Sequence, residues 1–407
     1  MLLRSDMADS FDMGYKEYFY HIYGNVVLFA EGMRALDMRA SLSAMLHEQS
    51  VCKRKAAISG CVSRYFDHLE IAQPVCIYSM FKALTSQLMI SLFLDLSMDV
   101  QEEAALIQQI ISLSVTHWHG LISIPVNWRM PVLGYSGGCS KALEARTELL
   151  KLVRARFDAI SAATDAAGPR DSSFLHEMSQ MPFASRTSSP CTPYSDEDDK
   201  SAMFDHVVLL VSALVPKAFA SLLASCLLYS PHWAADCVKE EGEEGAKLMH
   251  TDAVLLETAR LRPPFVAGRR VTKRKLEIDG YTVPAGRPVV YFSHSAHRDP
   301  VAFSEPDKFN WKRWLKGWLR GHYRENRQAK WDKLFVFGGG LRSCLGQHLS
   351  ETLIKMILEE FVSRFRWQFV DRVEAEEVEY KWLPVSRPKS MPTVLLAKRH
   401  SQHQHNN

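Results

Sequence analysis

One cysteine of this sequence lies in a glycine-rich segment whose residue types and spacing could hold a reactive group. The segment reads Phe337-Gly-Gly-Gly340-Leu-Arg342-Ser-Cys344-Leu-Gly346. Glycines tolerate positive φ, and without a side chain they let a flat ligand approach the backbone closely. A helix is expected from Leu345 to Phe365, so Cys344 lies where the free N–H groups of a helix start favour a thiolate. The alternative is a glycine turn around an inert, buried cysteine.

The neighbours of Cys344 each have a use in a cofactor site. Arg342 could pair with a cofactor carboxylate, because the guanidinium fork matches that group. Phe337 could pack beside the sulfur and exclude water, which tunes a redox potential. Gly340 and Gly346 would let the loop and the following helix pass close to the cofactor. A thiolate donates electron density to iron and favours cleavage of an O–O bond, so iron is the metal that we expect at Cys344.

This segment resembles the cysteine loop of the cytochrome P450 superfamily, FxxGxRxCxG, which fixes five residues at set spacings. The resemblance implies a haem b whose iron is held by Cys344. Two other segments are similar to motifs of that family. Glu257-Thr-Ala-Arg260 matches its ExxR motif, and Phe309-Asn-Trp-Lys-Arg313-Trp314 resembles the stretch that supplies a third charged residue. In the family these residues form a buried ionic network that braces the cysteine loop, which implies a structural triad of Glu257, Arg260 and Arg313.

The resemblance also implies partners for the haem propionates. Arg270 lies in RPPFVAGRRVTKRKLEIDGYTVPAG, which is followed by HRDP and resembles the family segment between the two motifs. There it aligns with a basic residue that pairs with a propionate. Arg39, in a helix expected around Gly32–Leu46, fits a second such partner. The similarity covers roughly residues 25–395 and is closest to the clan of retinoic acid hydroxylases and related sterol-acting enzymes.

The long central helix departs from the family pattern. The family carries an acid and an alcohol there, which relay protons to dioxygen. Alignment from Tyr229-Ser-Pro231 places the run at Val211-Ser-Ala-Leu214-Val215-Pro216, so Leu214 and Val215 occupy the acid and alcohol positions. Neither side chain can move a proton, and no Asp, Glu or Thr lies between residues 206 and 228. Ser212 is the catalytic candidate that remains, and Pro216 should kink the helix.

We therefore expect an oxidoreductase, a haem-thiolate monooxygenase that oxidises a lipophilic molecule of the retinoid, steroid or fatty-acid class. Two alternatives account for the missing relay: an isomerase or lyase acting on lipid hydroperoxides, or a non-catalytic haem or lipid binder. The sequence suggests an apolar pocket but does not identify the substrate. The expected pocket residues are Val211, Val215, Phe265 and Val266. An electron-donating reductase would dock on basic residues: Lys312, Lys316, Arg320, Arg324, Arg327, Lys330 and Lys333.

Composition sets the remaining expectations. A net charge of +3 over 407 residues predicts no nucleic-acid partner. The eight cysteines form no CxxC pair, and the first residues lack the apolar core of a signal peptide. We expect free thiols and an intracellular location, in the cytoplasm or at the cytoplasmic face of the endoplasmic reticulum, with peripheral membrane contact allowed. The apolar stretch 206–228 reads as a buried helix, because Pro216 and Lys217 interrupt it.

The predicted architecture is a single haem-thiolate domain over residues 1–407, mainly α with small β-sheets and a shortened N-terminal part. Apolar periodicity and helix-favouring composition predict helices at Met80–Leu96, Ala104–Val115, Lys141–Phe157, 204–229 and Thr251–Arg262. Short strands are expected at Lys275–Ile278 and Pro288–Phe292, with a turn at Asp279-Gly280. Residues 165–201 read as a mobile loop and residues 398–407 as a disordered tail.

Overall fold

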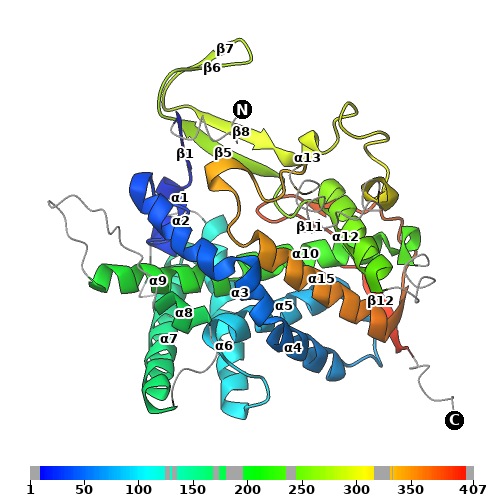
Figure 1. Ribbon diagram of the computed structural model, residues 1–407, viewed down its shortest axis with the longest axis horizontal. Coiled ribbons are helices and arrows are strands. Elements are labelled where there is room, and N and C mark those ends of the chain that lie inside the picture. The colour runs from blue at the N-terminus through cyan, green and yellow to red at the C-terminus, as the bar shows by residue number, and fades with distance from the viewer. Residues whose placement is uncertain are drawn as a thin grey trace.

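The computed structural model describes residues 10–123, 129–130, 135–167, 174–179, 196–234, 244–315, 331 and 333–399. Helices make up most of this part and small sheets lie at its edges, which confirms the expected fold class (Figure 1). The α-helices are α1 Lys16–Tyr23, α2 Gly32–Leu46, α3 Glu48–Lys53, α4 Lys55–Asp67, α5 Ile77–Leu94, α6 Gln101–His119, α7 Gly138–Ala167, α8 Phe174–Ser179, α9 Asp196–Val211, α10 Leu214–Leu228, α12 Glu244–Leu261, α13 Ser293–Ala296 and α15 Gln347–Arg364.

The strands form small antiparallel sheets. One sheet has the order β1–β5–β8, and another the order β2–β12–β9. The remaining strands pair as β10–β11, β3–β4 and β6–β7. Their bounds are β1 Phe11–Asp12, β2 Val75–Cys76, β3 Arg129–Met130, β4 Tyr135–Ser136, β5 Ala267–Thr272, β6 Leu276–Ile278, β7 Tyr281–Val283, β8 Pro288–Phe292, β9 Phe365–Phe369, β10 Tyr380–Lys381, β11 Arg387–Pro388 and β12 Thr393–Lys398.

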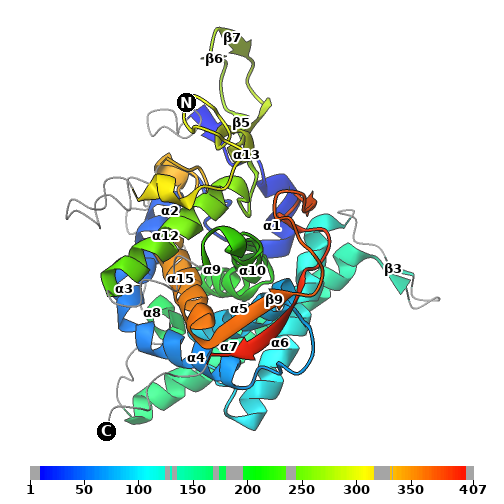
Figure 2. The ribbon, with the colours of Figure 1, turned by 90° about the vertical axis from the view of Figure 1, so that its right-hand side faces the viewer.

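The centre of the molecule is formed by α9 and α10, which Figure 2 shows almost end-on among the other helices. Helix α10 contacts α5, α12 and α15. Because neighbours cover it on several sides, most of its residues are buried, which explains why its sequence is apolar all round. By length and composition, Ile77–Leu94 and Lys200–Leu228 could each cross a membrane, yet both are mostly buried within the protein. This burial is expected of helices in a packed core.

The central helix is interrupted where Pro216 requires it. We predicted one helix over 204–229 with a kink at Pro216, whereas the structure ends α9 at Val211 and begins α10 at Leu214. Proline has no N–H and cannot donate to the carbonyl four residues earlier, that of Ser212. The next bond is restored, since the Lys217 N–H donates to the Ala213 carbonyl at 3.2 Å.

The strand predicted at Lys275–Ile278 is confirmed as β6, and the expected turn at Asp279-Gly280 leads into β7, which was not predicted. Both turn residues have positive φ, 50° at Asp279 and 82° at Gly280, the geometry that a two-residue hairpin turn favours. The hairpin projects from one end of the molecule (Figure 1). The strand predicted at Pro288–Phe292 matches β8, which pairs with β5. Strand β5 itself was not predicted.

The stretch 165–201 contains helical segments where we expected a continuous loop. Helix α7 runs to Ala167, α9 begins at Asp196, and between them α8 spans Phe174–Ser179. Phe174 is fully buried, and its ring stacks on that of Phe93 at 4.7 Å. Residues 168–173 and 180–195 lie outside the described residues, as does the tail beyond Arg399.

Candidate functional site

The cysteine loop is a set of backbone turns that ends at α15. The Gly338 N–H donates to the Phe335 carbonyl at 3.2 Å, and the Cys344 N–H donates to the Phe337 carbonyl at 2.8 Å. Gly338 and Gly340 have φ of 71° and 65°, a region that disfavours residues with a side chain. Gly346 is the residue that immediately precedes α15. These turns hold Cys344 at a fixed position before the helix.

The thiol of Cys344 lies at a boundary. The residue is exposed, yet burial raises the pKa of its thiol. The residue as a whole is therefore accessible to solvent, while protein atoms around its thiol disfavour the charged form. The Gly346 N–H and the charge of Arg39 act in the opposite direction and lower this pKa. We expected the helix start to favour the thiolate; that effect is present, but burial outweighs it in the protein alone.

The predicted structural triad is assembled around the Glu257 carboxylate, which is fully buried. Arg260 binds it with two contacts, Nη2 to Oε1 at 2.9 Å and Nε to Oε2 at 3.0 Å, and Arg313 Nε donates to Oε1 at 3.1 Å. Two further donors reach it, the Asn310 backbone N–H at 2.8 Å and the Trp314 indole N–H at 2.8 Å. The charge is thus neutralised and hydrogen-bonded, which buried charges require.

A histidine links this network to the cysteine loop. Arg260 Nη1 donates to the His297 carbonyl at 2.9 Å. The His297 Nε2 accepts the Phe335 N–H at 2.8 Å, and the Phe335 carbonyl in turn anchors Gly338. Burial, and then the charge of Arg260, lowers the pKa of His297 to about 4, so the ring is neutral and Nε2 can accept. The sequence contains His297 in the HRDP segment, but nothing in its pattern indicates this contact.

Three predicted cofactor-binding arginines gather beside the loop. Arg39 of α2 donates from Nη2 to the Ser343 carbonyl at 2.6 Å, and Arg342 Nη2 donates to the Ala30 carbonyl at 2.9 Å. Arg270 of β5 is buried. The charge of Arg342 lowers the pKa of Arg39, and that of Arg270 lowers the pKa of Arg342, although burial is the larger cause in both cases. Within the described ranges none of the three pairs with a carboxylate.

This arrangement fits a flat dianionic cofactor such as haem. Unpaired guanidinium groups in partly buried surroundings match two propionates, because each fork binds a carboxylate with two hydrogen bonds. A Cβ built on Gly346 would meet only the Cys344 Sγ and the Ser350 Oγ, each at 4.0 Å, so protein atoms do not fill the space beside the sulfur. Phe337 is partly buried, with its ring 5.2 Å from that of Trp331. The residues present therefore fit the group that the resemblance implies.

Ser212 is the one side chain of the central helix that we expected to act in catalysis. Ser212 is fully buried and donates its hydroxyl to the Leu209 carbonyl at 2.8 Å, so its part in catalysis stays a prediction. The carboxylate nearest in sequence to the acid position at Leu214 is that of Asp205. It pairs with Arg146 and accepts the Asn25 N–H at 2.7 Å. Burial raises the pKa of Asp205, and the charge of Arg146 opposes that change. Asp205 is therefore committed to holding α7, α9 and the chain after α1 together.

The expected pocket residues differ in their surroundings. Val211 lies within the main hydrophobic core, and Val215 packs against it. Val266 is buried, whereas Phe265 is exposed. The sequence analysis missed an apolar cluster of Trp118, Ala213, Ala218 and Val385, with Leu214 packed against it. It joins three elements that are remote in sequence, and no motif could have indicated it. Of the basic residues expected to dock a reductase, those from 316 to 330 lie outside the described residues.

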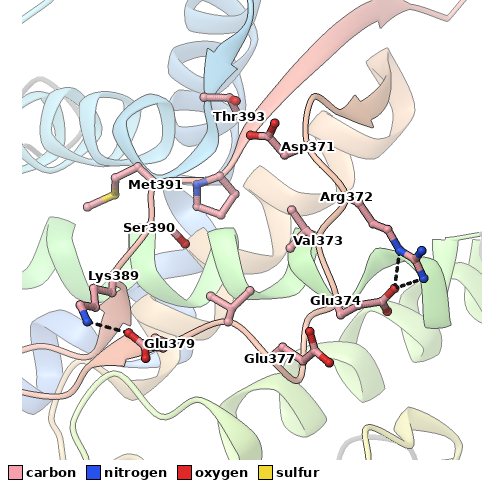
Figure 3. Close-up of a pocket in the computed structure, with 12 residues that line it drawn as sticks. Asp371, Arg372, Val373, Glu374, Glu377, Glu379, Lys389, Ser390, Met391 and Thr393 are labelled. Carbon is pink, nitrogen blue, oxygen red and sulfur yellow. Dashed lines mark hydrogen bonds and ion pairs between the residues drawn. The ribbon is translucent and has the colours of Figure 1, made fainter.

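A separate surface hollow of about 640 Å³ lies between the β9–β10 and β11–β12 connections. Its walls come from residues 371–379 and 389–393, and no predicted site residue lines it. Figure 3 shows two ion pairs on its walls: Lys389 pairs with Glu379 at 2.6 Å, and Arg372 pairs with Glu374 at 3.1 Å. We therefore assign the chemistry to the cysteine loop and not to this hollow.

Comparisons with known proteins agree with the geometry. The family model for cytochrome P450 matches residues 242–395, which contain the triad and the cysteine loop. Human cytochrome P450 26C1 is 27% identical over 334 residues, which span 72% of this chain and 59% of that protein. A putative cytochrome P450 120 of Synechocystis sp. is 25% identical over 351 residues, 83% of this chain and 71% of that protein.

Solved structures show the same fold. A retinoic acid bound cyanobacterial CYP120A1 is 21% identical and superposes with a TM-score of 0.74, covering 96% of this chain and 85% of that one. The family model, the curated relatives and the solved structure all support assignment of this chain to the cytochrome P450 superfamily. The matching segments span 59%, 27% and 31% of the lengths of three curated relatives, less than two thirds of each.

Removal of the buried carboxylate should destabilise the whole loop assembly. Glu257→Ala would leave Arg260 and Arg313 without a counter-charge, at a cost of about 3–5 kcal/mol. We expect little soluble, folded protein and a lower free energy of unfolding in denaturant titrations. Glu148→Ala, at a half-exposed carboxylate of α7 that pairs with Lys151, is the matched control and should behave like the unaltered protein. Equal stability of both variants would contradict the bracing role of Glu257.

The neutral ring of His297 makes the fold sensitive to acid. Its pKa of about 4 lies below the usual 6.5, so between these pH values the unfolded chain binds a proton that the folded protein does not. The contribution to stability is thus complete above pH 6.5 and is lost as pH falls toward 4. His297→Asn keeps an acceptor for the Phe335 N–H but cannot titrate. In this window, the slope of unfolding free energy against pH should decrease by about 1.4 kcal/mol per pH unit, and an unchanged slope would refute the assignment.

Proposed function

We propose that this chain is a haem-thiolate monooxygenase that oxidises a lipophilic small molecule, with Cys344 as the ligand of the iron of haem b. One observation carries the proposal. An exposed thiol is held by a loop that a fully buried ionic network braces, and three arginines without carboxylate partners among the described residues face the same place. A structural cysteine in a glycine turn would need neither the network nor the three unpaired cations.

Each side chain of the site has a definite task in this proposal. Arg39, Arg270 and Arg342 would bind the propionates, and Cys344 would hold the iron as a thiolate. Phe337 would exclude water beside the sulfur, and the glycines would leave room for the ring. Bound haem supplies the chemistry that activates dioxygen when single electrons arrive. The protein fixes the electron-donating ligand and the polarity around it, which are its means of tuning that chemistry.

Several relatives support a lipophilic substrate. The solved CYP120A1 is described with bound retinoic acid. A relative from Streptomyces melanosporofaciens, 32% identical over 124 residues, is named cyclooctat-9-en-7-ol 5-monooxygenase. The apolar positions on α10 and at Val385 agree with such ligands. We propose the retinoid, steroid or fatty-acid class for this chain, an electron-donating reductase as its partner and an intracellular location.

A second function is favoured by one specific observation. The acid and alcohol positions of the central helix are Leu214 and Val215, and the Ser212 hydroxyl is bound to the Leu209 carbonyl. An isomerase or lyase that rearranges lipid hydroperoxides would need no delivery of protons to dioxygen. A non-catalytic haem or lipid binder would show neither reaction. Turnover supported by NADPH separates the monooxygenase from both alternatives, and consumption of hydroperoxide without a reductase separates those two.

The spectrum of the reduced protein with carbon monoxide tests haem and thiolate together. The unaltered protein should give the band of a thiolate-ligated haem, and Cys344→Ala should abolish it. Cys52→Ala, at another exposed thiol, is the control and should retain the band. If Cys344→Ala keeps the thiolate band, another cysteine is the ligand and the proposed site is wrong.

Reductase-driven oxygenation should be poorly coupled. With Leu214 and Val215 in place of an acid and an alcohol, most electrons should appear as hydrogen peroxide and not in product. Leu214→Glu combined with Val215→Thr should improve the coupling, and lipid hydroperoxides should be better substrates than dioxygen. The measurement is product formed per NADPH consumed, over a panel of lipids. Tight coupling in the unaltered protein would contradict this prediction and would assign proton delivery to Ser212, water or the substrate.

A further inference from the structure

Three cationic side chains meet near the first turn of α10 without a counter-charge. They are Lys82 of α5, Lys217 of α10 and Arg387 of β11. In the described part of the chain, no carboxylate forms an ion pair with any of them. Cations that are withdrawn from water repel one another and lose hydration, so such a group is costly unless an anion joins it.

The contacts between the three elements place these residues together. On α5, Tyr78, Lys82 and Thr85 follow at steps of four and three, so they share one face of the helix. The Thr85 hydroxyl donates to the Pro216 carbonyl of α10 at 3.1 Å, which turns this face toward the first turn of α10. Lys217 is the next residue after Pro216. Its Nζ lies 4.3 Å from the centroid of the Trp118 ring.

A second contact brings β11 to the same place. Ser221 lies one turn after Lys217 on α10, and its hydroxyl donates to the Ser386 carbonyl, which directly precedes Arg387. The neighbouring Val385 belongs to the apolar cluster with Trp118, Ala213 and Ala218. The charged group therefore lies beside a buried apolar cluster, at whose edge Leu214 is partly exposed.

A buried hydroxyl in this group is without a partner. Tyr78 is 5% exposed, and its phenol oxygen makes no hydrogen bond within the described residues. Burial raises the pKa of Tyr78 to about 12, and the charge of Arg387 acts against it. A buried hydroxyl with no partner is uncommon, because it forfeits a hydrogen bond that water would have supplied. A ligand oxygen could accept this bond.

The lowered pKa values of Lys217 and His119 are consistent with repulsion among the cationic side chains of this group. Burial, then the charges of Lys82 and Arg387, lowers the pKa of Lys217 to about 7. His119 faces the same charges; burial lowers its pKa, and Lys217 and Lys82 lower it further. The charges that act on Lys217 are thus cationic, and a bound anion would raise its pKa.

We propose that Lys82, Lys217 and Arg387, with the Tyr78 hydroxyl, bind the carboxylate of an amphipathic ligand whose apolar part packs against Leu214, the partly exposed residue at the edge of the cluster of Trp118 and Val385. This inference rests on the proposed function for its role, since it narrows the substrate class to lipophilic acids. The binding site itself does not depend on turnover. One end of the ligand would be fixed by charge, and the other would be oriented by apolar contact.

Calorimetric titration of the haem-loaded full chain tests the site with a matched pair of probes, dodecanoate and dodecanol. Dodecanoate should bind more tightly than dodecanol. Lys217→Met should weaken dodecanoate binding by about 10-fold and leave dodecanol binding unchanged, because a charge-assisted hydrogen bond is lost. Arg387→Gln should act in the same direction. Lys151→Met, which removes an exposed lysine of α7, should have no effect.

The outcomes separate this inference from the proposed function. Equal binding of the two probes, or dodecanoate binding that neither variant weakens, would overturn the site even if oxygenation is observed. Selective dodecanoate binding that both variants weaken would support the site even if no oxygenation is found. Acetate is the third probe: if it binds as tightly as dodecanoate, the apolar surface contributes nothing and the amphipathic ligand is refuted. Equal thermal unfolding midpoints for all variants confirm that they remain folded.

Discussion

A single carboxylate buried from water, that of Glu257, is the constraint on which the rest of the structure depends. It receives hydrogen bonds from Arg260, Arg313, the Asn310 backbone and the Trp314 indole. A buried charge is tolerated only when partners of this kind surround it, so several segments must meet at one point for the fold to form. Hydrogen bonds then connect this network to the cysteine loop: Arg260 donates to the His297 carbonyl, and His297 accepts the Phe335 N–H. The position of the Cys344 thiol is thereby linked to a buried charge in another segment of the chain.

Much of this could be read from the sequence, for a physical reason. Glu257 and Arg260 meet because they are three residues apart on a helix, and the turns before Cys344 follow from glycines that permit positive φ. Contacts between remote segments could not be read in this way. The acceptance of the Phe335 N–H by His297 depends on how two loops cross, and a histidine in a sequence gives no sign of it. Helix α8 escaped prediction because six residues are too few to establish a periodicity.

The ionic network and the central helix differ in how their charged side chains are paired. On the side of the ionic network, the buried Glu257 carboxylate is fully paired and hydrogen-bonded. Along the central helix, from residue 206 to residue 228, Lys217 is the one residue with a side chain that is ordinarily charged, and its pKa is lowered. This stretch therefore has few polar groups, and its one ordinarily charged side chain has no counter-charge among the described residues. A bound ligand could supply that charge. In the proposed function, the paired network would support the haem and the central helix would contact the ligand.

Arg260 contacts its surroundings largely through main-chain oxygens, those of His297, Pro306 and Lys308. Every residue has a backbone carbonyl, so the residues at 306 and 308 can be substituted without loss of these hydrogen bonds. These hydrogen bonds constrain the backbone conformation of that segment, and they do not constrain which side chains it carries. Over evolutionary time it can therefore acquire new surface properties while it continues to support the core.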